Sequence, residues 1–163
     1  MPRPLVLDSC IPVGFFDGTS QNEGSRFVAS VVIKLSKSVY YKVKMNCGLG
    51  INSRGEILAL SCLLFFSRLR ELNILQIVGD SKIIVDWLAF RCNLQVTSLE
   101  TWKQRIKSLS SEFDFLEAQQ IYKEFNSNVD ILSKQDFELE EGKIYYSYFE
   151  GYREKTVEVI TLL

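Results

Sequence analysis

The sequence predicts a mixed α/β domain, with a five-stranded sheet of three antiparallel strands followed by two parallel strands, flanked by helices. Two observations predict this class. Segments rich in Val, Ile and Tyr fill the first part of the chain, and Leu-rich helical segments then alternate with short apolar runs. Strands that come first, followed by helix–strand–helix units, fit one sheet of mixed direction.

The expected elements follow from hydrophobic periodicity and from turn residues. Asp17 and Gly18 are expected to end the first strand, and residues 19–22 to turn the chain. The expected strands are 12–16, 27–35, 40–47, 75–78 and 115–122, and the expected helices are 56–70, 81–90, 98–109 and 128–133. Residues 48–55 are expected to form a loop. The helix over 56–70 is apolar nearly all round, so we expect it to be covered on most sides.

Composition limits both the domain count and the location. The 163 residues, 47% of them apolar and 24% charged, favour one globular domain over residues 1–163. The longest apolar block, Ile57 to Phe66, is too short to cross a membrane. The N-terminus lacks the layout of a secretion signal. We therefore expect an intracellular protein of the cytoplasm or nucleus that does not enter a membrane.

The absence of histidine excludes several chemistries. Zinc sites with histidine ligands and Ser-His-Asp or Cys-His catalysis need a residue that this chain lacks. The four cysteines, Cys10, Cys47, Cys62 and Cys92, form no CxxC pair, and we expect them to be reduced. The net charge of −1 provides no general field for a polyanion, so a nucleic-acid binder would need a local patch or metal ions.

Four acids stand at the expected ends of elements. Asp17 closes the first strand, Glu56 opens the long helix, Asp80 follows the fourth strand and Asp130 opens the last short helix. Element ends of this kind converge on one crevice in α/β sheets. Clustered carboxylates suit magnesium or manganese, and two such ions can cleave phosphodiesters without histidine. We expect all four side chains to enter one pocket, with Asp17 in the middle.

Each acid has a simpler interpretation when it is taken alone. Asp17-Gly18 can be an ordinary turn, and Asp80 can be a helix N-cap. Glu56 can be a first-turn charge that interacts with the helix dipole, and Asp130 can be a cap of the short helix. The metal-site hypothesis rests on all four acids occurring in one order.

Four sequence blocks carry a resemblance to a known family. They are FFDGTSQ, INSRGEILALSCLLFF, LQIVGDSKIIVDWL and IYKEFNSNVDILSK. In this order and spacing the chain resembles type 1 ribonuclease H domains, and more narrowly the reverse-transcriptase-like RNase H domains of plant retroelements and plant genomes. The resemblance covers Val13 to Lys134, so the core is expected over 13–134. Residues 137–163 form an extension whose role the resemblance does not indicate.

The resemblance implies a hydrolase with two Mg²⁺ or Mn²⁺ ions, acting as a monomer on the RNA strand of RNA–DNA hybrids. It implies that Asp17 bridges both ions, that Glu56 and Asp80 complete one site, and that Asp130 holds the other ion. It also implies nucleic-acid contacts from Gly18, Thr19, Ser20, Asn52, Ser53, Arg54 and Ser81.

The sequence leaves two points open. Trp102, Lys103, Arg105 and Lys107 form either a strip that grips nucleic acid or an ordinary exposed helix face. The substrate loops also depart from the family pattern, with Glu23 and Ile51 at positions that usually carry other residues. An inert descendant that binds nucleic acid or a protein is therefore the second hypothesis. A structural role without nucleic acid is the third.

Overall fold

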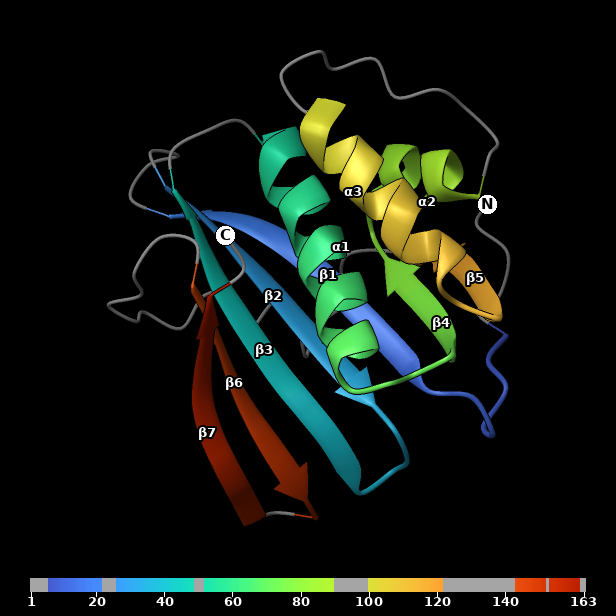
Figure 1. Ribbon diagram of the computed structural model, residues 1–163, viewed down its shortest axis with the longest axis vertical. Helices are drawn as coiled ribbons and strands as arrows, with labels where there is room; N and C mark the ends of the chain where they lie inside the picture. The colour runs from blue at the N-terminus through green and yellow to red at the C-terminus, as the bar shows by residue number, and fades with distance from the viewer. Residues whose placement is uncertain are drawn as a thin grey trace.

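The computed structural model describes residues 6–21, 26–48, 52–89, 100–121, 143–151 and 153–161. These residues form seven strands and three helices (Figure 1). In chain order the elements are β1 (Val13–Gln21), β2 (Arg26–Lys34), β3 (Val39–Gly48), α1 (Asn52–Leu69), β4 (Ile74–Gly79), α2 (Lys82–Leu88), α3 (Glu100–Ser111), β5 (Phe115–Gln120), β6 (Lys143–Glu150) and β7 (Arg153–Thr161).

All seven strands join one sheet in the order β5-β4-β1-β2-β3-β6-β7. Strands β1, β2 and β3 are antiparallel, whereas β4 pairs in parallel with both β1 and β5. The predicted mixed sheet is therefore confirmed, but its predicted size of five strands is wrong. Strands β6 and β7 form a hairpin, in which β6 pairs with the free edge of β3 and β7 pairs with β6.

The main core lies between the sheet and α1. Figure 1 shows α1 and α3 side by side in front of the sheet. Along one row of the sheet, Phe16, Val31, Val43 and Tyr146 are cross-strand partners, and all four belong to the main buried cluster. Side chains alternate between the faces of a strand, so this row defines the inner face of the sheet. The opposite face is called the outer face below.

Two predicted boundaries near the acids are wrong for one physical reason. Strand β1 continues through Asp17 and Gly18 to Gln21, and α1 begins at Asn52, four residues before Glu56. A Cβ atom on Gly18 would lie 2.3 Å from the carbonyl carbon of Gly55. Gly18 is therefore the place where the first turn of α1 rests on β1, rather than a turn residue.

The C-terminal hairpin is held to the core by an aromatic cluster on the inner face. Tyr146 of β6 lies 4.8 Å from Phe66 of α1 between ring centroids, and Tyr148 lies 5.0 Å from Tyr41. The guanidinium of Arg70 lies over the Tyr146 ring and donates a hydrogen bond to its hydroxyl group. Aromatic packing and cation–π contacts therefore anchor β6 to the end of α1.

The sequence of this hairpin carries local signals of a strand and a turn. Lys143–Glu150 is rich in aromatic residues, and its burial alternates at the start of the strand. Gly151 has a φ of 62°, which the turn between β6 and β7 requires and which glycine adopts at little cost. The predicted short helix over 128–133 lies outside the described residues. Within the part of the chain described, no helix has the length and apolar character needed to cross a membrane.

The contact at Gly18 predicts a specific cost for an added methyl group. Gly18→Ala places Cβ against the backbone of α1, which cannot rotate away, so we expect a loss of about 2–3 kcal/mol in the free energy of unfolding. Urea denaturation measures this loss. Gly14→Ala is the matched control, because its Cβ would meet the side chain of the buried Leu63 rather than backbone and should cost less, about 1 kcal/mol. Equal losses in the two variants would contradict the proposed contact.

Candidate metal centre

Three of the four predicted acids reach one place from three different elements. Asp17 lies within β1, Glu56 lies in the second turn of α1, and Asp80 directly follows β4. The pairing of β1 with β4 ends at Phe16 and Gly79. Beyond that pair the two strands separate, and the acids meet at this opening under the start of α1.

The three carboxylates are close enough to share a cation. One oxygen from each of Asp17, Glu56 and Asp80 lies within 4.8 Å of the others. Asp17 is fully buried, whereas Glu56 and Asp80 are partly exposed. The position of Asp80 is supported from the neighbouring strand, because Gln120 Nε2 donates a hydrogen bond to the Asp80 carbonyl oxygen at 3.4 Å.

Crowding changes the proton affinity of the central glutamate. Burial, followed by the charges of Asp17 and Asp80, raises the pKa of Glu56 to about 9. The backbone N–H of Gly18 donates to Glu56 Oε1 at 3.4 Å and opposes this rise. Without a cation, Glu56 is therefore protonated at neutral pH, since three ionised carboxylates at this spacing repel one another.

The residues fit a divalent cation of the magnesium type. All three candidate ligands are hard carboxylate oxygens, which Mg²⁺ and Mn²⁺ prefer. Oε2 of Glu56 is buried and has no hydrogen-bond partner among the described residues. A cation at this position would satisfy that atom and neutralise the repulsion, so the arrangement suits metal binding better than a purely structural role.

The other predicted site residues have different outcomes. Asp130 lies outside the described residues, so its place beside the three acids stays a prediction. Gly18 contacts α1, and Ser81 occupies the N-cap position of α2 next to Asp80 without a capping hydrogen bond from its side chain. Thr19 and Ser20 belong to β1. Asn52, Ser53 and Arg54 form the first turn of α1 rather than a loop, and their side chains are not described.

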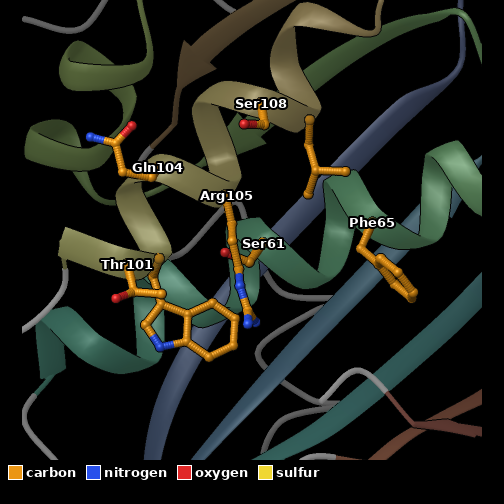
Figure 2. Close-up of a pocket in the computed structure, with 8 residues that line it drawn as sticks. Ser61, Phe65, Thr101, Gln104, Arg105 and Ser108 are labelled. Atoms are coloured by element: carbon orange, nitrogen blue, oxygen red, sulfur yellow. The ribbon is translucent and has the colours of Figure 1, made fainter.

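The predicted basic strip lies on α3, apart from the acids. The Arg105 guanidinium lies 4.8 Å from the ring centre of Trp102, and Lys103 forms an ion pair with Glu100 at 3.3 Å. Lys107 is exposed. Figure 2 shows the groove between α1 and α3, of about 570 Å³, whose lining includes Ser61 and Arg105. None of the three acids lines this groove, so this groove is not the metal centre.

Comparison with known families agrees with this fold. A family model described as reverse transcriptase-like matches residues 15–136. This match covers most of the chain, and the chain belongs to that family. The domain is therefore of the RNase H-like class. No curated protein matches the sequence.

Solved structures share the fold at low sequence identity. RNase H1 from the halophilic archaeon Halobacterium salinarum is 19% identical, with a TM-score of 0.68, over 75% of this chain and 93% of that chain. The N-terminal RNase H domain of a Mycobacterium tuberculosis protein is 19% identical, with a TM-score of 0.69, over 75% of this chain and 95% of that chain. LC11-RNase H1, solved in complex with an RNA/DNA hybrid, is 20% identical, with a TM-score of 0.67, over 74% and 92%.

The repulsion at Glu56 predicts how stability depends on pH without metal. A folded-state pKa above the ordinary value means that the folded chain holds a proton that the unfolded chain releases. In EDTA, stability is therefore lost as pH rises from about 4.5 to about 9. Glu56→Gln removes this loss, so its melting temperature should rise above that of the wild type by about 2–4 °C or more at the alkaline end.

Thermal melts at several pH values in EDTA measure the difference between the two proteins. Glu117→Gln on β5 is the control, because it removes an exposed carboxylate remote from the cluster. Its effect on the free energy of unfolding should stay within about 0.5 kcal/mol at every pH. A Glu56→Gln difference that does not change with pH would show that Glu56 is not repelled by Asp17 and Asp80.

Proposed function

We propose that this protein is a metal-dependent endoribonuclease that hydrolyses the RNA strand of RNA–DNA hybrids. The observation that carries the proposal is the carboxylate cluster of Asp17, Glu56 and Asp80, which lies within 4.8 Å at the strand opening of an RNase H-like fold. The solved neighbour bound to an RNA/DNA hybrid supports the choice of substrate. Asp130 is proposed as a fourth ligand.

The described residues would have different roles at the site. Asp17, Glu56 and Asp80 would hold Mg²⁺ or Mn²⁺, with two ions once Asp130 is included. Bound ions of this kind supply an activated water and stabilise the leaving oxygen in phosphodiester hydrolysis. Gly18 orients the Glu56 carboxylate through its backbone N–H, and the contact between Gly18 and α1 keeps Glu56 beside Asp17. Histidine has no part in this arrangement, in agreement with its absence from the chain.

Substrate choice would follow from shape. RNA–DNA hybrids present 2′-hydroxyl groups in a wide, shallow minor groove, and these groups distinguish them from DNA duplexes. We propose that Gly18, Thr19, Ser20, Asn52, Ser53, Arg54 and Ser81 contact the hybrid around the metal centre. The start of α1 and the segment after β4 carry several of these residues to the cluster.

Cation binding predicts a rise in thermal stability. Mg²⁺ or Mn²⁺ binds the folded chain and relieves its carboxylate repulsion, so at a hundredfold excess over Kd the melting temperature should rise by about 5–10 °C. Asp17→Asn should abolish this rise. A matched control, Asp86→Asn, removes a carboxylate of α2 that pairs with Lys82 at 2.6 Å and should preserve the rise. An equal metal response in Asp17→Asn would place the cation elsewhere.

Cleavage of a labelled hybrid tests the activity itself. With Mg²⁺ or Mn²⁺ we expect cleavage of the RNA strand in the hybrid and no cleavage of duplex DNA. Asp80→Asn should lower the rate by at least about 100-fold, because changes to groups that merely support metal ligands already cost about 10–100-fold. Asp86→Asn should retain activity. Binding of the hybrid without cleavage by the wild type would instead establish the inert-module alternative.

A further inference from the structure

The outer face of the sheet carries two lysines among three aromatic rings. In register across β1, β2, β3 and β6, one row contains Val13, Lys34, Tyr40 and Phe149, and the next contains Phe15, Val32, Lys42 and Ser147. We call these eight residues the outer strip. The described helices lie in front of the opposite face of the sheet (Figure 1).

Contacts confirm that these side chains form one surface. The Tyr40 and Phe149 rings stack with centroids 4.9 Å apart and planes within 4°. The Lys42 ammonium lies 5.3 Å from the Phe149 centroid and 5.9 Å from that of Tyr40. Lys34 lies 5.5 Å from the centroid of Phe15. In the strip, Lys42 therefore lies beside the stacked pair of rings and Lys34 lies beside the third ring.

The eight positions of the strip carry two positive charges and no negative one, and the row continues from Phe149 to Glu154 on β7. The three rings and two lysines of the strip are partly exposed, whereas Val32 beneath them is only 2% exposed. None of the eight positions is acidic, and neither lysine forms an ion pair with a described acid. The stacked pair Tyr40–Phe149 explains how β6 is held to β3. It does not explain why two lysines, neither paired with an acid among the described residues, lie on this face of a chain whose net charge is −1.

We propose that the outer strip binds single-stranded nucleic acid. Grooves that bind single strands combine cations for the phosphates with aromatic rings for the bases, and the strip presents both. Its place in the sheet also suits this partner. Phe15 and Asp17 are two residues apart on β1, about 7 Å along the strand, so a strand at the metal centre can continue over Phe15 and Lys42.

The strip depends on the C-terminal hairpin. Phe149 comes from β6, which begins at Lys143, beyond the family match over residues 15–136. The hairpin therefore adds a surface that the matched part of the chain lacks. The direction of the bound strand rests on the proposed function. The binding of single-stranded nucleic acid to the outer strip does not rest on it, so binding can be tested without cleavage.

The test uses the full chain and a fluorescent single-stranded DNA of about 20 nucleotides, long enough to span such a site. Anisotropy is measured without metal, so that loss of catalysis cannot change the result. Lys42→Ala should weaken binding about threefold to tenfold and lower the slope of log affinity against log salt by about 0.7. Phe149→Leu keeps an apolar side chain without the ring face and should weaken binding to a similar extent.

Lys82→Ala on α2 is the matched control, because it also removes one exposed positive charge and its only described pairing is with Asp86. It should leave affinity and salt slope unchanged. Circular dichroism checks that each variant is folded. If Phe149→Leu does not fold, the result for Lys42→Ala alone decides whether the outer strip binds the DNA. Equal weakening by Lys42→Ala and Lys82→Ala, or no binding by the wild type, overturns the proposal. A wild-type dimer that Phe149→Leu dissociates, together with no DNA binding, overturns it in favour of a protein interface.

Discussion

The close approach of α1 to β1 at Gly18 is the constraint on which the candidate site depends. Without a side chain at this position, the backbone at Gly55 rests on the strand and carries Glu56 to the side of Asp17. Strand β4 ends where β1 continues, so Asp80 enters the same opening. The result is a concentration of negative charge that the fold tolerates through a proton on Glu56 or through a bound cation.

Much of the sheet could be predicted because periodicity and strand order carry it. The alternation along β3, the apolar run of β4 and the Leu-rich α1 each have one reasonable interpretation, and together they define a mixed sheet. The meeting of Asp17, Glu56 and Asp80 was predicted from their expected places at element ends and from the family resemblance, although Asp17 and Glu56 lie inside their elements. Their distances and the raised pKa of Glu56 were not predicted, because these depend on how closely α1 packs against β1.

The errors arise where tertiary contacts override local signals. Asp17-Gly18 has the composition of a turn, but the glycine serves a helix–strand contact within β1. Gly55 was expected to belong to a loop, yet it lies inside α1. Glycine suits this position because a larger side chain would press on Phe27. The hairpin of β6 and β7 was missed because it follows the recognisable blocks. Its pairing with β3 and its packing against Phe66 and Arg70 are long-range contacts that no local pattern specifies.

The central claim is that three distant acids form one cation site, and a crystal structure grown with Mn²⁺ tests it most directly. The account predicts an anomalous difference peak at coordination distance from carboxylate oxygens of Asp17, Glu56 and Asp80, with Gly18 still in contact with α1. A well-ordered structure in which the three carboxylates point apart, or in which Mn²⁺ binds only at other surfaces, would contradict the account.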